Sequence, residues 1–355
     1  MFFRKIDKTP KSVVRHNKIN FGTFNSTPQK IDISGIRGPF TGFPLPPFIT
    51  DTRIKGTLSF AFNLDDYIGM VEFSDLKLLG TADVVFWNKN TNQKFSYHSL
   101  IGPRRRFVPK NIVESVCANY RKSRFVKIFW SKKINRISLN FSVHGDNARP
   151  SAKCVVHADY AQKESHQILN VSPAPSTRRC AVSWFVPLVV TGGLKIDKKQ
   201  KEIDWIEETP GLGMLMMHKV YSSFKVNSDS AYSICNLDGR KIGFHFANYD
   251  YAPEDDDYTN DNFLFVDNEI TLFPSVVISH TFGVAEKWVI QDTENMVDLV
   301  FTPKSIENHS TNFLLAKNTY TLIFGNFEGT VMTKESEKIE IKNSFGFVKK
   351  NLLRS

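Results

Sequence analysis

The chain has 355 residues, of which 41% are hydrophobic and 13% aromatic, and it carries a formal net charge of +10. The length suits one large domain or two ordinary ones, and the hydrophobic fraction is enough for a buried core. No run approaches the roughly 18 apolar residues of a membrane-spanning helix, and the N-terminus lacks the apolar segment of a signal peptide. We therefore expect a cytoplasmic protein.

The four cysteines, at positions 117, 154, 180 and 235, lie far apart and form no CxxC pair. Their spacing fits neither a zinc site nor a dense disulfide framework. We expect free, mostly buried thiols, a reducing compartment, and neither a metal nor a cofactor.

The positive charge is concentrated in residues 104–136, where Glu114 is the only acidic residue and Arg104, Arg105 and Arg106 begin the run. Such a stretch can contact an anionic surface, which would place the protein at an intracellular membrane. It can equally form solvated loops and strand edges, where lysine discourages edge-to-edge pairing. Nucleic acid is not an expected partner, because no RNA-recognition or zinc-finger signature is present.

Residues 1 to about 30 are polar and basic without periodicity, and we expect a flexible arm. Residues 35–48 follow with several prolines, which forbid a helix or a central strand, so this segment is expected to be extended chain. The best helical candidate is Asn111–Lys122, with Asn111 as a possible cap.

Strand patterns dominate the rest of the chain. Apolar and polar residues alternate with period two in residues 54–63, 137–143, 241–246 and 297–301. Residues 88–92 form a turn signal between two strand-like runs, as in a hairpin. Many short strands and few helices predict an all-β protein of antiparallel barrels or sandwiches.

The composition also suggests two halves, separated by a polar, proline-containing stretch at residues 172–177. We expect an N-terminal β-barrel or sandwich over residues 31–170 and a C-terminal barrel over residues 171–355. The oligomeric state cannot be predicted from these patterns.

Several enzyme motifs are absent. Gly211-Leu212-Gly213 lacks the third glycine of a dinucleotide-binding fingerprint, and there is no phosphate-binding loop or nucleophile elbow. The acidic run Asp255–Asp257 with Asp261 has no glycine or terminal glutamate at the positions that a calcium loop requires.

The second half of the sequence resembles the family described as domain of unknown function 2804. The matching segments keep the family's order, and they are Pro187–Ile196, Asp238–Phe244, Thr259–Asn268, Phe301-Thr302-Pro303, Phe324–Val331 and Phe345-Gly346-Phe347. The resemblance implies two lipocalin-like (calycin) barrels or strongly curved sheets packed together, with few short helices. By analogy with carotenoid 1,2-hydratases, tocopherol cyclases and ceramide-carrying survival-factor proteins, it also implies an apolar pocket for a hydrophobic molecule.

The chain departs from the family at two places. Met214, Met216 and Met217 stand where relatives carry an acidic residue, and Val348-Lys349-Lys350 replaces the terminal glutamates. If the acidic residue is a proton donor in relatives, these departures put that chemistry in doubt here.

Three residues are catalytic candidates if the protein is an enzyme. His218 adjoins the methionines, and it either fills a core or lines a pocket; His245 either lies on the surface or points inward beside a ligand. Asp261 and its neighbour Asn262 match family positions and either anchor a ligand's polar group or cap a turn. The expected ligand contacts are Met214, Met216, Met217, Tyr221, Phe224, Phe244 and Asn262.

These features lead to three hypotheses. The first is a non-catalytic carrier of a lipid or isoprenoid in a pocket lined by Phe and Met. The second is a cofactor-independent hydratase, cyclase or isomerase acting on a polyprenyl-type substrate, which requires at least two of the three catalytic candidates to meet at one cavity. The third is a structural or interaction module whose barrels are filled by side chains.

Overall fold

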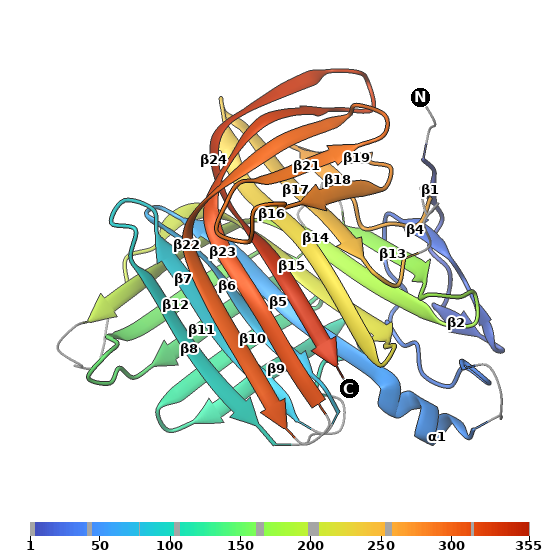
Figure 1. Ribbon diagram of the computed structural model, residues 1–355. Coiled ribbons are helices and arrows are strands. Elements are labelled where there is room, and N and C mark those ends of the chain that lie inside the picture. Colours follow the sequence, from blue (N-terminus) through green and yellow to red (C-terminus); the bar gives the residue numbers. More distant parts are fainter. Residues whose placement is uncertain are drawn as a thin grey trace.

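The computed structural model describes residues 4–40, 45–77, 79–102, 107–160, 167–197, 206–252, 258–313 and 316–354. Within these ranges, the strands form two large curved sheets that pack together, so the predicted all-β class is confirmed (Figure 1). The described helices are the short α1 (Pro47–Thr50) and a 3-10 turn at Asp51–Arg53. Neither is long and apolar enough to cross a membrane.

The first sheet is nearly closed and follows the order β8-β7-β6-β5-β15-β14-β12-β11-β10-β9. The guanidinium groups of Arg121 and Arg124, at the β9–β10 end, donate to the carbonyls of Leu100 and His98 in β8, which joins the two edges. The strands in this order of the first sheet are β5 (Ile54–Leu64), β6 (Tyr67–Asp75), β7 (Gly80–Asn88), β8 (Lys94–Ile101), β9 (Glu114–Arg121), β10 (Arg124–Ser131), β11 (Arg136–Val143), β12 (Ser151–Ala158), β14 (Cys180–Asp197) and β15 (Thr209–Tyr221).

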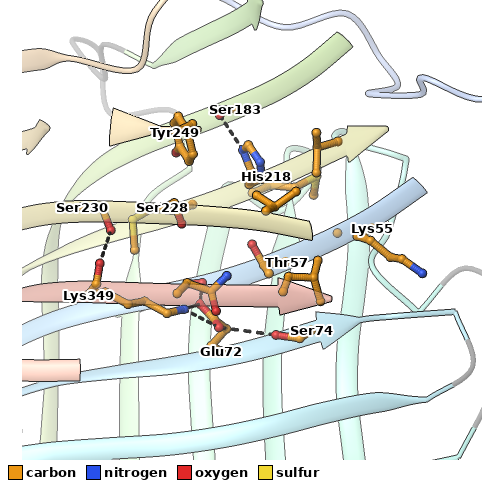
Figure 2. A pocket seen from close by; sticks show the side chains of 18 of the residues that line it. Lys55, Thr57, Glu72, Ser74, Ser183, His218, Ser228, Ser230, Tyr249 and Lys349 are labelled. Carbon is orange, nitrogen blue, oxygen red and sulfur yellow. Dashed lines mark hydrogen bonds and ion pairs between the residues drawn. The ribbon is translucent and has the colours of Figure 1, made fainter. Parts of the chain in front are cut away.

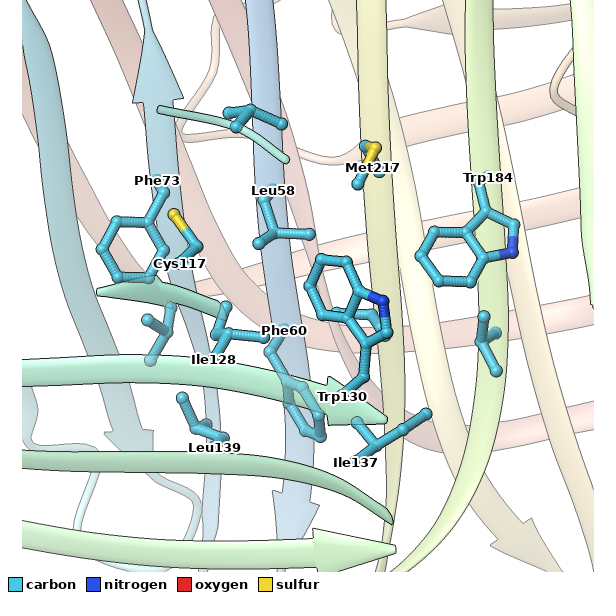
Figure 3. Packing of buried hydrophobic residues seen from close by; sticks show 14 of the residues in the cluster. Leu58, Phe60, Phe73, Cys117, Ile128, Trp130, Ile137, Leu139, Trp184 and Met217 are labelled. Carbon is cyan, nitrogen blue, oxygen red and sulfur yellow. The ribbon is translucent and has the colours of Figure 1, made fainter. Parts of the chain in front are cut away.

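The lumen of this first sheet is filled by its own side chains. Because successive residues of a strand point to opposite faces, the even positions of β5, such as Leu58 and Phe60, enter the lumen. They meet Trp130, Leu139 and Trp184 from β10, β11 and β14 (Figure 3). The two indole rings pack edge to face at 6.0 Å between centroids.

The N-terminal residues do not form the flexible arm that we expected. β1 (Ile6–Asp7) pairs with β4 (Gly22–Phe24), and β4 pairs with β13 (Ile168–Pro173) of the first sheet. Val13, Phe24 and Ile31 are buried in the first core. Their apolar side chains are too widely spaced to show a period, which is why the sequence pattern missed them. A small hairpin of β2 (Val14–Arg15) and β3 (Lys18–Ile19) completes this segment.

The second sheet has the order β19-β18-β17-β16-β24-β23-β22-β21-β20 and curves into a half-barrel. Because β14 and β15 belong to the first sheet, the division between the two sheets lies between Tyr221 and Lys225, whereas the sequence led us to expect a domain boundary at residue 170. Its strands are β16 (Lys225–Leu237), β17 (Arg240–Tyr249), β18 (Phe263–Val266), β19 (Glu269–Leu272), β20 (Val276–Ser279), β21 (Trp288–Asp292), β22 (Val297–Phe313), β23 (Ala316–Met332) and β24 (Lys338–Arg354).

The helix expected at Asn111–Lys122 is instead the edge strand β9. It pairs with β10 over its full length, and Cys117 from it enters the first core. Tertiary pairing therefore overrides a weak local helical preference.

The outer face of β5, β6, β14 and β15 is covered by the second sheet. The long strands β22–β24 lie over β5–β8, with their colours from orange to red against the blue of the earlier strands (Figure 1). Met70, Trp87, Phe185, Phe263 and Phe324 form an apolar cluster between the sheets. β5 and β6 are therefore buried on both faces, and any polar group on their outer face is enclosed.

Candidate functional site

A cavity of ≈ 120 Å³ lies between the two sheets, next to this apolar cluster. Its walls come from β5, β6, β14 and β15 on one side and from β16, β17 and β24 on the other (Figure 2). Serine, histidine, tyrosine and an ion pair make up much of the lining, beside Phe185, Met216 and Val226. The chemistry of this cavity is thus mixed, with polar groups set against apolar walls.

A chain of hydrogen bonds runs along one wall of the cavity. The Tyr251 hydroxyl lies 3.2 Å from His218 Nε2, and His218 Nδ1 lies 2.8 Å from Ser183 Oγ. Ser183 Oγ in turn donates to Asp261 Oδ2 over 2.6 Å. The four residues come from β14, β15 and the segment after β17, so the second sheet must pack on the first to assemble the chain.

The Asp261 carboxylate, at one end of this series of hydrogen bonds, determines which group donates in each of them. A carboxylate only accepts, so Ser183 uses its single proton there and must accept from His218 Nδ1–H. The neutral imidazole then presents an unprotonated Nε2 to the Tyr251 hydroxyl. Burial lowers the pKa of His218 despite the nearby Asp261 charge, and burial with that same charge raises the pKa of Tyr251. Near neutral pH every bond therefore points from Tyr251 towards Asp261.

Asp261 is 5% exposed, and two further donors hold it. The Tyr249 hydroxyl donates to Oδ2 over 3.0 Å, and Asn170 Nδ2 donates to Oδ1 over 2.8 Å. Tyr249 also stacks on the His218 ring with 5.5 Å between centroids. A buried carboxylate is thus satisfied by hydrogen bonds rather than by a cation.

His245 faces the same cavity from β17. Its Nδ1 lies 2.7 Å from the backbone carbonyl of Asp261, which can only accept, so the neutral ring carries its proton on Nδ1. The ring packs between Phe185 and Tyr232, each at 4.6 Å between centroids, and burial lowers the pKa of His245 to about 4. Nε2 is therefore unprotonated at neutral pH and can accept a hydrogen bond.

A buried ion pair forms the opposite wall. Lys349 Nζ of β24 lies 2.6 Å and 2.7 Å from the two carboxylate oxygens of Glu72 in β6. Ser59 Oγ donates to the same carboxylate over 2.9 Å. The Glu72 and Lys349 side chains are only 8% and 11% exposed, so the pair joins the two sheets inside the protein.

The structure brings all three predicted catalytic residues together. His218 and His245 line one cavity, and Asp261 is bonded to both, through Ser183 and through its own backbone carbonyl. Of the expected ligand contacts, Met216 and Met217 line this cavity.

The other expected ligand contacts do not line it. Tyr221 lies in the first core and donates to Asp51, Phe244 lies in the second core, and Met214 is buried between the sheets. Phe224 is 57% exposed beneath the Arg354 guanidinium. Asn262 has a structural role, because its side chain accepts from the Ala247 amide and donates to the Pro274 carbonyl. Adjacent residues of a strand point to opposite faces of the sheet. Residues close to His218 or His245 in the sequence therefore need not line the same cavity.

The expected anion contacts Arg104, Arg105 and Arg106 lie outside the described residues. Two later arginines of the basic stretch, Arg121 and Arg124, have the structural role described above.

Sequence reasoning missed Ser183, Tyr249, Tyr251, Glu72 and Lys349. Each is a common residue type within a strand or a loop, and none belongs to a motif. One signal was available for Glu72, which is a lone acidic residue within the apolar run from Tyr67 to Phe73. A charge in such a run is expected to have a partner.

A second polar cluster joins the sheets outside this cavity. His98 of β8 lies 3.0 Å from Asp83 through Nδ1 and 3.0 Å from Glu307 through Nε2. His309 stacks on it with 3.8 Å between centroids and an 8° interplanar angle. The donor atoms of Asp83, His98 and His309 are close enough for a metal ion, but the lone pairs of two parallel rings do not converge. We therefore interpret the cluster as an ion-pair network.

This network predicts a loss of stability at alkaline pH. Burial lowers the pKa of His98, but hydrogen bonds to Asp83 and Glu307 outweigh it and raise the pKa to about 9. A folded pKa above the unfolded value stabilises the fold fully below about pH 6.5, and this contribution is lost as the pH rises through 9. We expect the free energy of unfolding of wild type, measured in urea relative to His98→Asn, to fall by about 1–3 kcal/mol between pH 6 and pH 9.5.

The variant His98→Asn is expected to flatten this dependence, because asparagine does not titrate. His144→Asn, which replaces an exposed histidine of the same sheet region, serves as the control and should keep the wild-type slope. An equal slope in wild type and His98→Asn would contradict the assignment.

Fold and site together define an all-β protein of two packed curved sheets, with a cavity of mixed polar and apolar lining between them. The chain belongs to the family described as "Domain of unknown function (DUF2804)", whose model matches residues 49–354. None of the curated proteins matches the sequence.

The solved structures that resemble this fold have low sequence identity to this chain. CghA has 8% sequence identity and a TM-score of 0.47, with 92% of this chain and 94% of that chain covered. Kievitone hydratase from Nectria haematococca has 9% identity and a TM-score of 0.43, with 85% and 89% covered. A putative AttH from Nitrosomonas europaea has 10% identity and a TM-score of 0.38, with 84% and 92% covered.

Proposed function

We propose that the protein is a cofactor-independent acid–base enzyme, an isomerase or hydratase that moves a proton next to a carbonyl group of a small substrate. The observation that carries the proposal is the directed hydrogen-bond chain from Tyr251 through His218 and Ser183 to Asp261 at the wall of the cavity. Such a chain has the composition and the continuity that proton transfer requires.

This chain of hydrogen bonds can take up a proton from the substrate at Tyr251. When the Tyr251 oxygen accepts a proton from the substrate, its own proton passes to His218 Nε2. The proton on His218 Nδ1 passes to Ser183, and the serine proton passes to Asp261 Oδ2. The reverse sequence returns a proton to the substrate at another atom, so the protein is regenerated without a co-reactant.

The opposite wall supplies the complementary charge. Removal of a proton beside a carbonyl leaves negative charge on the carbonyl oxygen, and a preorganised cation stabilises it. The Lys349 ammonium has three N–H donors, and Glu72 holds it in place through its two oxygens. The third donor of this ammonium is suited to a substrate oxygen.

Carriage of a long lipid is the second candidate, and it has less support. The cavity between the sheets measures ≈ 120 Å³, whereas pockets for drug-sized ligands are typically about 300–1,000 Å³, and a larger cavity of ≈ 720 Å³ at one end of the first sheet has two ion pairs in its lining. Much of its lining is polar, and the lumen of the first sheet is occupied by side chains such as Trp130 and Trp184. Phe185, Met216 and Tyr232 nevertheless provide an apolar side for part of a substrate.

Hydrogen–deuterium exchange into carbonyl compounds tests the enzymatic proposal. The full chain is incubated in deuterated buffer with a panel of β,γ-unsaturated ketones and β-hydroxy ketones, and products are analysed by mass spectrometry. We expect at least one compound to gain deuterium faster than in buffer alone. His218→Gln should lower that rate by about 10²–10⁴-fold, the usual contribution of a positioned acid or base.

His144→Gln is the matched control, because it replaces an exposed histidine far from the described chain of bonds. It should exchange at the wild-type rate. The proposal fails if no compound of the panel exchanges above the buffer rate, or if His218→Gln and wild type exchange equally.

A further inference from the structure

A second cavity, of ≈ 720 Å³, opens at one end of the first sheet and contains a buried lysine. Lys219 lies next to His218 in β15, but its side chain points to the other face of the strand, away from the candidate active site. It is 5% exposed and lines this cavity together with Ile33, Ile54 and Val108.

The surroundings of Lys219 do not support a charge. Its Nζ donates to the backbone carbonyls of Ile31 and Pro109 over 3.0 Å and 2.6 Å. No carboxylate of the described residues lies within 4.0 Å of it. An isolated buried ammonium is costly, so the amine loses its proton instead. Burial accordingly lowers the pKa of Lys219 to about 7, against weaker attraction from Asp32 and Asp75.

The geometry suits a neutral amine in particular. A neutral amine has two N–H donors and one lone pair, and two carbonyls are present to accept from the donors. The lone pair is then the group left to react. Lysine becomes a nucleophile towards carbonyl compounds in this neutral state.

Four of the other charges at the cavity form two ion pairs, and the fifth, Asp51, accepts from the Tyr221 hydroxyl. Lys110 pairs with Asp32 at 2.8 Å, and Lys77 pairs with Asp75 at 2.9 Å. The remaining lining includes the apolar side chains already named and the Ser34 hydroxyl. An uncharged molecule with an apolar body fits this environment better than an anion, because Lys110 and Lys77, the charged lysines of the described lining, are already paired.

We propose that Lys219 is a covalent capture site for a small, uncharged aldehyde. The amine nitrogen attacks the aldehyde carbon to form a C–N bond. The carbonyl oxygen then leaves as water with the two protons of the amine, and a C=N imine remains. The step is reversible and needs no oxidant or reductant.

Reductive trapping with benzaldehyde tests this site in the full-length wild-type protein. Benzaldehyde and cyanoborohydride are added at pH 7, and the modified lysines are located by peptide mass spectrometry. At this pH about half of Lys219 is neutral, compared with about 10⁻³ of an ordinary surface lysine. We expect Lys219 to be labelled first at limiting benzaldehyde, and the preference to vanish in urea-unfolded protein.

Lys55 is the matched internal comparison. It also donates to two backbone carbonyls, those of Thr52 and Leu76, but it lines the first cavity, and its pKa is lowered only to about 8, chiefly by burial. Lys219 should be labelled ahead of Lys55, and Lys219→Met should lose the dominant product. Labelling confined to surface lysines in folded wild-type protein would overturn the proposal, whether or not the variant folds.

Discussion

Lys349→Met is expected to reduce the free energy of unfolding by about 3–5 kcal/mol, the usual cost of leaving one partner of a buried ion pair without the other. Glu72 would keep its buried charge, with Ser59 and Ser74 as its remaining partners. Two hydroxyl donors cannot replace the ammonium that now contacts both carboxylate oxygens. Urea unfolding, followed by circular dichroism, measures the change from the midpoint and slope.

The double variant Glu72→Gln/Lys349→Met separates this interaction from simple loss of packing. With both charges removed, the desolvation cost disappears as well, so the double variant should regain much of the stability. Lys342→Met, on an exposed lysine of the same strand, is the control and should change stability by less than about 0.5 kcal/mol. Additive effects of the two single changes would contradict a direct Glu72–Lys349 interaction.

Asp261→Asn is expected to cost about 2–4 kcal/mol, because an amide cannot accept all the hydrogen bonds that the carboxylate accepts. Ser183 and Tyr249 donate to one oxygen, and Asn170 donates to the other. Asn170 cannot simply turn its amide over, since its Oδ1 already accepts from Thr23. One pair of donors would therefore face each other in a buried site.

The same substitution removes the proton acceptor at the end of the chain. Deuterium exchange into any ketone that wild type processes should fall by about 10²–10⁴-fold. Asp66→Asn is the matched control: Asp66 is exposed and accepts from the Asn90 side chain outside this cavity, so both stability and exchange should stay close to wild type. A fully active Asp261→Asn variant would show that the hydrogen-bond chain from Tyr251 to Asp261 has only a structural role.

The departures from the family acquire a different meaning in the folded protein. The three methionines indicated that an acidic group had been lost, which argued against acid–base chemistry. The structure supplies carboxylates from other parts of the chain, with Asp261 next to β18 and Glu72 in β6. Lys349, one of the residues in place of the family's glutamates, is the partner of Glu72. The charge pattern of this cavity therefore depends on contacts between sheets, which no local motif records.

The sequence by itself determined the all-β class, because alternation with period two dictates which residues of a strand such as β5 share a face. It also determined the family, through motifs whose order is preserved, and it named His218, His245 and Asp261 as catalytic candidates. Only the tertiary structure decided that His218 and His245 line one cavity and that Asp261 is hydrogen-bonded to His245 and, through Ser183, to His218. Their meeting depends on the packing of the second sheet over the outer face of the first, which joins residues as distant in sequence as Glu72 and Lys349. Strand periodicity specifies faces within one sheet, whereas the choice of facing sheet is made by long-range packing.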